Sequence, residues 1–406
     1  MFKIAYCGFP HTGGTYTIYR LLREELTKHD IELRWVALVP PGFQLCDEFQ
    51  PDKTFGELVN LKPGNPKETA RSFVKHIETN YDGIIINVLA NTIQINAARY
   101  IQTYICKLQI VHSITPATYR AARVIRDHVH ATVCPSPRIT RDLIHKMNFS
   151  PKKTHNISHA VNLPSFNQVC SKRSKDSPLK LLYLGRLEDG SKGILWLPDI
   201  LKNCLQIGVN VLMTVAGDGP DLSRLKLKIN QMALGEYINF YGKVNYVEVP
   251  KLLTCHHVFL MPSRYEGFGF SLIEAMASGC VPVCSRISGV TDFIVSHGEN
   301  GFLFDVGNVK SAARFISQLT DEKIWQHFSI NARLVSQSRF SVEQQAQSYA
   351  SLIKDLMENL PEIAQPLTLD NWQLPSSLKP SFSVYIPARV KNILRLWWER
   401  LASRAK

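Results

Sequence analysis

No stretch of the 406-residue sequence approaches the roughly eighteen uninterrupted apolar residues that a transmembrane helix needs. The first residues, Met1 to Gly8, have the pattern of a short strand running into a turn rather than that of a signal peptide. These two absences predict that the folded body of the protein is cytoplasmic.

The sequence also lacks the patterns that disulfides and bound metals leave. Its nine cysteines are odd in number and show no Cys-x-x-Cys spacing, which argues against a disulfide framework and for a reducing compartment. Cys280 and Cys284 are separated by Val-Pro-Val, which has the composition of a buried strand. The His256-His257 pair has no other ligands near it in the sequence, and no Asp-x-Asp motif occurs. We therefore predict no metal site.

The chain is long and basic. At 406 residues it is too long for one ordinary core and is most simply two domains. A net charge of +13 favours anionic partners, such as nucleic acid, an anionic membrane surface or a phosphorylated substrate. Because no known nucleic-acid-binding motif is present, we predict that nucleic acid is not a partner.

In the first half, apolar runs alternate with helical patterns, which predicts right-handed βαβ units and a doubly wound parallel sheet. The loop Gly8 to Thr15 follows the first strand and precedes a helix over Tyr16 to Lys28. It is neither a Gly-x-Gly-x-x-Gly fingerprint nor a Walker loop, and its Gly13-Gly14 pair is explained equally by a tight turn or by a phosphate. Residues 40–65 have the composition of an exposed loop. The further strands that the pattern predicts are Leu33–Val39, Asp82–Val88 and Leu108–Val111.

A new buried strand begins at Leu179 and runs into Gly185-Arg-Leu-Glu-Asp-Gly-Ser-Lys-Gly193. Arg186 and Lys192 in this loop are either solvated surface cations or groups that stabilise a negatively charged leaving group. His112 directly follows an earlier strand, at the sheet edge where ligands of such folds gather. A lone histidine in such a position is more often structural.

The most informative stretch is Tyr265 to Gly279. Glu266 and Glu274 lie eight positions apart. A glycine-containing loop lies between them, and a helical run follows that loop. Ser271 and Glu274 have the Ser-x-x-Glu spacing of a capping box, which predicts a helix that begins at Ser271. A helix N-terminus preceded by glycines suits a phosphate group, and acids on both sides of it suit a ligand that carries hydroxyls.

This stretch resembles the Glu-x7-Glu signature of the GT-B retaining glycosyltransferases of family 4. The resemblance continues into Gly279–Val283, Gly289–Ile294 and Gly298–Phe304. It implies an α/β protein with two Rossmann-like, doubly wound domains facing a cleft, and a C-terminal helix that crosses back onto the first domain. We expect the domains at residues 1–164 and 179–341, a linker at 165–178, the crossing helix at 342–360, and a basic amphipathic extension at 361–406.

The resemblance also implies roles for individual residues. Arg186 and Lys192 would stabilise the diphosphate that leaves, and His112 would approach the donor sugar or the reaction centre. Glu274 would hold the ribose hydroxyls. The transferred sugar would be held by Glu266 and the N–H groups of Gly267, Phe268 and Gly269, and the nucleobase would lie beside the backbone at Val244. Ser271 and Leu272 would offer N–H groups to the phosphates, and the backbone at Gly13 and Gly14 would approach the donor diphosphate or the acceptor.

The implied activity is transfer of a hexosyl group from a nucleoside-diphosphate sugar to a hydroxyl, with retention and without an obligatory cofactor or metal. The acceptor would be a sugar or a lipid-linked sugar in cell-envelope polysaccharide or glycolipid synthesis. The alternative is an inactive, sugar-nucleotide-binding subunit. Residues 387–404 have the pattern of a basic amphipathic helix, which predicts peripheral contact with the inner face of the membrane or, equally, packing on protein.

Overall fold

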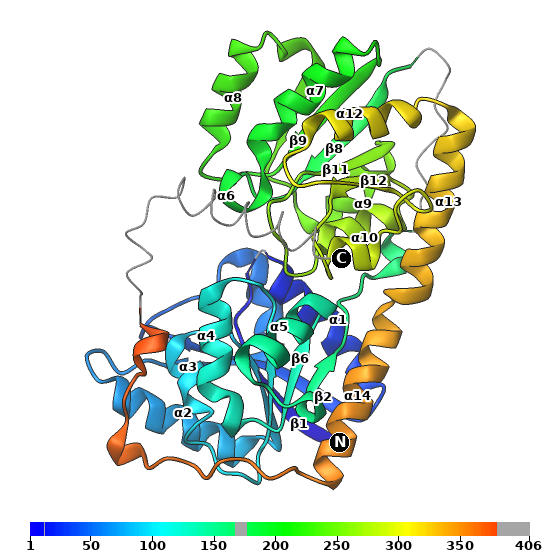
Figure 1. Cartoon of the computed structure of the whole chain (residues 1–406). Coiled ribbons are helices and arrows are strands. Elements are labelled where there is room, and N and C mark those ends of the chain that lie inside the picture. Colours follow the sequence, from blue (N-terminus) through cyan, green and yellow to red (C-terminus); the bar gives the residue numbers. More distant parts are fainter. Residues whose placement is uncertain (12, 167–176, 380–406) are drawn as a thin grey trace. The chain divides into compact units, whose positions relative to one another are not determined.

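The computed structural model describes residues 1–11, 13–166 and 177–379. These residues form two compact units, each built around one parallel sheet (Figure 1). Of the described residues, unit 1 contains 1–160 and 342–379, and unit 2 contains 161–341. In the described part of the chain, no helix is both long and apolar enough to cross a bilayer.

Unit 1 has a seven-stranded sheet in the order β3-β2-β1-β4-β5-β6-β7. Its central strands are almost continuously apolar because both faces of a parallel sheet are covered by helices. The order reverses direction between β1 and β4, and this is the topological switch point at which such sheets bind ligands. The strands are β1 (Phe2–Cys7), β2 (Ile31–Val39), β3 (Gly56–Asn60), β4 (Gly83–Asn87), β5 (Cys106–Ile110), β6 (Ala131–Cys134) and β7 (Thr154–Asn156), and the helices are α1 (Gly14–Thr27), α2 (Pro66–Asn80), α3 (Thr92–Ala97), α4 (Pro116–Ile125), α5 (Pro137–Met147) and α14 (Val342–Glu358).

The end of the described chain is fixed to unit 1. Helix α14 packs against α1 through an apolar face that includes the fully buried Tyr349. Beyond it, the backbone N–H of Ala364 donates to the carbonyl of Asp127 at 2.8 Å, and the Trp372 ring lies 4.6 Å from that of Tyr100. The amphipathic segment 387–404, for which we predicted membrane or protein contact, lies outside the described residues.

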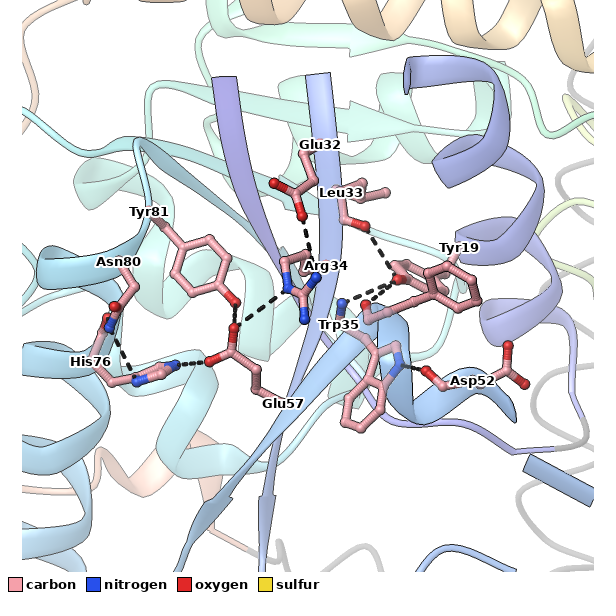
Figure 2. A network of polar contacts seen from close by, with 11 residues as sticks. Tyr19, Glu32, Leu33, Arg34, Trp35, Asp52, Glu57, His76, Asn80 and Tyr81 are labelled. Atoms are coloured by element: carbon pink, nitrogen blue, oxygen red, sulfur yellow. Dashed lines mark hydrogen bonds and ion pairs between the residues drawn. The ribbon is translucent and has the colours of Figure 1, made fainter. Parts of the chain in front are cut away.

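The expectation of an exposed loop over residues 40–65 was only partly right, because the segment is mostly exposed but residues 47–60 are regular. Residues Asp47–Phe55 form a 3-10 helix, and Gly56–Asn60 form the edge strand β3. Figure 2 shows the polar network that fixes them, in which Glu57 accepts from the Tyr81 hydroxyl at 2.8 Å and lies 2.8 Å from Nε2 of His76. Burial opposes ionisation of Glu57, but Tyr81, His76 and Arg34 outweigh it and lower the pKa of that carboxyl.

A tertiary contact therefore decides the conformation of this edge, which its composition alone could not reveal. The indole Nε1 of Trp35 donates to the carbonyl of Asp52 at 3.0 Å, and the Tyr19 hydroxyl donates to that of Phe55 at 2.8 Å (Figure 2). Gly56 lies directly against the Trp35 ring, so closely that an added Cβ would be 2.0 Å from Cδ2.

Unit 2 has a six-stranded sheet in the order β10-β9-β8-β11-β12-β13, with its switch point between β8 and β11. Strand β8 coincides with the apolar run that predicts it in the sequence. The strands are β8 (Leu179–Leu184), β9 (Val211–Ala216), β10 (Ile238–Gly242), β11 (Val258–Met261), β12 (Val281–Ser285) and β13 (Phe302–Phe304), and the helices are α6 (Asp189–Lys192), α7 (Leu197–Gln206), α8 (Leu222–Gln231), α9 (Val249–Thr254), α10 (Phe270–Ala277), α11 (Thr291–Ile294), α12 (Val309–Gln318) and α13 (Glu322–Arg339).

Candidate active site

The candidate residues of unit 2 follow the two strands that flank its switch point. Strand β8 leads into the segment 185–193, in which Arg186 lies in a loop and Lys192 ends the short helix α6, and the neighbouring strand β11 leads into the loop that carries Glu266. Because parallel strands end at the same edge of the sheet, these loops lie side by side at the place where doubly wound folds bind ligands. The fold thus brings together residues that are 74 positions apart in the sequence.

Lys192 and Glu266 form an ion pair. The Nζ atom of Lys192 donates to Oε1 of Glu266 at 2.6 Å, and the hydroxyl of Ser263 donates to the same oxygen at 2.7 Å. Glu266 is buried, with 9% of its side chain exposed, whereas 30% of the Lys192 side chain remains exposed. The carboxylate is therefore held in place by two donors, while the ammonium group still faces solvent and can reach a ligand.

Arg186 lies on the same loop and is exposed. The hydroxyl of Tyr183 donates to its backbone carbonyl at 2.8 Å, which fixes the turn. Within the described residues, the guanidinium group has no ion-pair partner. The turn packs closely on the loop after β9, where a Cβ added to Gly217 would be 2.0 Å from the carbonyl oxygen of Gly185. Arg186 is therefore a free cation on a rigid turn.

The predicted capping box was wrong. Helix α10 begins at Phe270, and its N-cap is Gly269 in a left-handed conformation with φ of 95°. No side chain caps this helix end, so Ser271 is not the cap and Glu274 does not reach back toward it. A glycine adopts this backbone conformation without the steric cost that Cβ brings, which is why the sequence places one there.

Glu274 is instead a buried acid, with 4% of the residue exposed. Its Oε1 atom has no hydrogen-bond partner among the described residues. Burial raises the pKa of Glu274 to about 8, and an interaction with the Tyr246 hydroxyl offsets part of this increase. An orphaned acceptor in a buried position suits a ligand that brings hydroxyl donors.

The other predicted donor-binding residues of unit 2 differ in exposure and in whether their backbone N–H groups already have partners. Gly267 is partly exposed, and Gly269 lies at the start of α10. The Phe268 side chain is buried, with its ring 5.9 Å from that of Phe340, so only its backbone can face a ligand. The N–H of Leu272 already donates to the carbonyl of Gly269 at 3.0 Å, and Ser271 and Val244 are partly exposed.

Unit 1 places its candidates at its own switch point and at the end of β5. Gly13 is the N-cap of α1 and Gly14 is its first residue, with no side-chain cap, so this helix end offers N–H groups. His112 follows β5, and its Nδ1 lies 3.2 Å from Nε2 of His159. Burial lowers the pKa of His112 to about 4. For His159, burial and then the neighbouring His112 lower the pKa well below its usual range. Both rings are neutral at pH 7.

Several residues of these sites carry no signal in the sequence. Ser263 and Tyr246 reach Glu266 and Glu274 only through the fold, and no spacing rule connects them. His159 stands in a turn, and only its place after β7 hints at a role. Among the described residues, no cluster of three His, Cys, Asp or Glu side chains could hold a metal ion.

A cavity of about 570 Å³ in unit 1 lies away from these residues, near the amino ends of β6 and β7. The two cationic side chains that line it already have partners. Arg126 pairs with Asp127 at 2.9 Å, and Lys153 donates to the carbonyl of Glu362 at 2.6 Å. We therefore place the candidate site at the switch points and not in this cavity.

Comparison with known proteins finds similar sequences and similar structures. Residues 167–335 match the model of the family described as glycosyl transferases group 1. The chain is 26% identical over 351 residues to 2-deoxystreptamine N-acetyl-D-glucosaminyltransferase of Niallia circulans, a match that covers 79% of this chain and 85% of that protein. It is 27% identical to N-acetyl-alpha-D-glucosaminyl L-malate synthase of Bacillus anthracis over 152 residues, 37% of this chain and 39% of that protein. The chain thus spans about two fifths of the length of the first curated relatives it matches.

Among solved structures, Anabaena Alr3699/HepE in complex with UDP and glucose is similar with a TM-score of 0.72 and 18% identity, covering 88% of this chain and all of that one. Sucrose-phosphate synthase from Thermosynechococcus elongatus is similar with a TM-score of 0.72 and 21% identity, over the same shares. These likenesses confirm the predicted fold, two parallel α/β units of the GT-B type. The match to the family model of the glycosyl transferases group 1 lies within unit 2 and covers about two fifths of the chain.

Proposed function

We propose that this protein transfers a hexosyl group from a nucleoside-diphosphate sugar to a hydroxyl acceptor, with retention of anomeric configuration. The observation that carries the proposal is the pair of Lys192 and Glu266 at the switch point of unit 2, beside the free cation Arg186. The names of relatives support it, since the protein from Niallia circulans is a glycosyltransferase and the Anabaena structure holds UDP and glucose.

The chemistry follows from where charge develops. When the bond between the anomeric carbon and the diphosphate oxygen breaks, negative charge grows on the leaving group. Arg186 and Lys192 stabilise this charge more strongly in the transition state than in the ground state, which accelerates the reaction. The acceptor hydroxyl attacks the same face, and an oxygen of the donor phosphate takes its proton.

The remaining residues bind and orient the donor. Glu274 accepts hydrogen bonds from the ribose hydroxyls, which gives its orphaned Oε1 a partner. Glu266 and the backbone of Gly267 to Gly269 address the transferred sugar, and the backbone near Val244 borders the nucleobase. In unit 1, the helix end at Gly13 and Gly14 addresses the phosphates or the acceptor, and the neutral His112 approaches the sugar.

The biological setting is the finer part of the proposal. The acceptor is a sugar or a lipid-linked sugar, and the reaction belongs to cell-envelope polysaccharide or glycolipid synthesis on the cytoplasmic side of the membrane. One of the relatives is an alpha-1,3-galactosyltransferase of Escherichia coli that is named for a diphosphoundecaprenol-linked sugar, which supports this setting.

A panel of nucleotides tests the donor site. Thermal shift is measured with UDP, GDP, ADP and TDP and their glucose conjugates, and with UDP-N-acetylglucosamine, on the wild type and on Arg186→Ala and Glu274→Ala. A ligand at 100 times its dissociation constant stabilises by about 2.7 kcal/mol, which is readily detected. We expect one nucleotide to shift the wild type and the exposed-cation control Lys310→Ala, and to shift both site variants much less.

Two results would contradict the proposal. If no nucleotide shifts the wild type, the chain has no donor site of this kind. If the site variants respond like the wild type, the nucleotide binds elsewhere. Binding with no release of nucleotide from any sugar conjugate would instead favour an inactive sugar-nucleotide-binding subunit.

A further inference from the structure

A second ion pair, between Asp189 and Arg264, lies beside the candidate site of unit 2. The Nη2 atom of Arg264 is 2.8 Å from Oδ2 of Asp189, and its Nε donates to the backbone carbonyl of the same residue at 2.9 Å. Only 11% of each side chain is exposed. The guanidinium carbon lies 3.8 Å from the centre of the Trp196 ring, so the cation is also stacked. Neither charge is left over to hold a ligand.

This pair joins the same two loops that carry Lys192 and Glu266. Asp189 is the first residue of the short helix α6 in the segment after β8, and Arg264 belongs to the loop after β11. The backbone N–H of Arg264 also donates to the carbonyl of Ser191 at 2.7 Å, directly before Lys192 in the sequence. A backbone hydrogen bond and a side-chain ion pair therefore connect the two segments just before Lys192 and Glu266 in the sequence.

The contact continues on the other side of Lys192. Gly193 has a left-handed φ of 63°, and a Cβ at this position would be 2.2 Å from the carbonyl oxygen of Pro262. Only a glycine permits this approach of the two backbones. Lys192 thus stands between two points, Ser191 and Gly193, at which its loop touches the loop of Glu266.

Asp189 is itself held from two further directions. Its backbone N–H donates to Oδ2 of Asp221 at 2.8 Å, and its Oδ1 accepts from the N–H of Leu195 at 3.1 Å. Since every polar group of the carboxylate has a partner, the pair has one arrangement rather than several. A buried, fully bonded ion pair of this kind fixes geometry more than it adds stability.

We propose that Asp189 and Arg264 form a positioning pair that sets the place of Lys192 relative to Glu266 and to the donor diphosphate. The inference rests on the proposed function, because it assigns the pair's effect to Lys192. A reactive group misplaced by about 1 Å can cost on the order of 100-fold in rate, so loosening the two loops should impair catalysis without any contact between the pair and the substrate.

A double-mutant cycle tests whether the pair acts through Lys192. Release of nucleotide is measured for Arg264→Gln, Lys192→Ala and the double variant, with whichever of UDP-, GDP-, ADP- and TDP-glucose and UDP-N-acetylglucosamine the wild type cleaves fastest. We expect Arg264→Gln to lower kcat roughly 10- to 100-fold while KM changes much less. The double variant should be no more than about twofold slower than Lys192→Ala, because Arg264 then has no lysine left to place.

The control is Arg71→Gln, which removes an exposed arginine that pairs with an aspartate of unit 1, Asp370. It should leave kcat within about twofold of the wild type. If Arg264→Gln does not fold, the same cycle is run with Arg264→Lys, which keeps the charge but loses the donor to the Asp189 carbonyl.

The outcomes separate this inference from the proposed function. If the kcat losses of the two single variants multiply in the double variant, Arg264 acts independently of Lys192. That result would overturn the positioning role alone. Unchanged kcat in Arg264→Gln would do the same. A wild type that neither binds nor cleaves any of the donors would overturn the proposed function, and the inference with it.

Discussion

Replacing Glu274 with glutamine should change how the stability of unit 2 depends on pH. Burial raises the pKa of this carboxyl from 4.5 to about 8. Because the folded protein then binds the proton more tightly than the unfolded chain does, this group lowers stability progressively as the pH rises from about 4.5 to about 8. Glutamine has nearly the same shape and does not titrate, so the variant lacks this loss.

The size of the effect follows from the two pKa values. One pKa unit corresponds to about 1.4 kcal/mol, so the wild type should lose roughly 3–4 kcal/mol between pH 5 and pH 8 through this group. For a unit of this size 1 kcal/mol shifts Tm by about 2–4 °C, and the variant should therefore gain roughly 10 °C relative to the wild type over that interval.

The assay is thermal unfolding of the ligand-free protein at intervals between pH 5 and pH 8. Glu236→Gln, at an exposed glutamate of the same unit, is the matched control and should follow the wild type at every pH. Parallel curves for the wild type and Glu274→Gln would refute the reasoning, because they would mean that the carboxyl is already ionised, and hence solvated or paired, in the folded protein.

Two further variants test unit 1. Gly56→Ala places a Cβ 2.0 Å from the Trp35 ring, and it should lower the free energy of unfolding by about 1–3 kcal/mol, measured by denaturant titration. The control is Gly235→Ala in unit 2, which has open space around its new Cβ and should change stability by less than about 0.5 kcal/mol. Equal effects of the two substitutions would contradict the packing of Gly56 against Trp35. Burial lowers the pKa of His112 to about 4. The contribution of this neutral histidine to stability is therefore fully present above pH 6.5 and is lost as the pH drops toward 4. At pH 4.5, His112→Asn should therefore have lost about 2–3 kcal/mol less of its free energy of unfolding than the wild type has lost. A loss of the same size in both proteins would contradict a histidine that is buried in its neutral form.

Sequence patterns located the regular parts of this fold well. Strand β8 was predicted where it is observed, because a continuous apolar run that ends at a turn residue leaves few alternatives. The GT-B fold was predicted correctly from the resemblance around Glu266 and Glu274. The edge strand β3 was missed, because its stability comes from contacts with Trp35 and Tyr81 and not from its own composition.

The candidate site likewise has features that the local sequence reveals and features that depend on tertiary contacts. The spacing of Glu266 and Glu274 is visible in the sequence, but a capping box is only a local rule, and here the burial of Glu274 overrides it. The partners of these acids come from separate elements, so no local pattern could reveal Ser263, Tyr246 or the pair of Asp189 and Arg264. The roles of the individual site residues stay predictions.

Hydrogen–deuterium exchange with and without nucleotide tests the central claim most directly. The ligand is the nucleoside diphosphate that stabilises the protein most in the thermal-shift panel, at a saturating concentration. A donor site at the switch point of unit 2 predicts protection of backbone amides within residues 185–193 and 266–274, with no protection around the unit 1 cavity at residues 126–154. Protection confined to that cavity, or unchanged exchange in both unit 2 loops, would contradict the account.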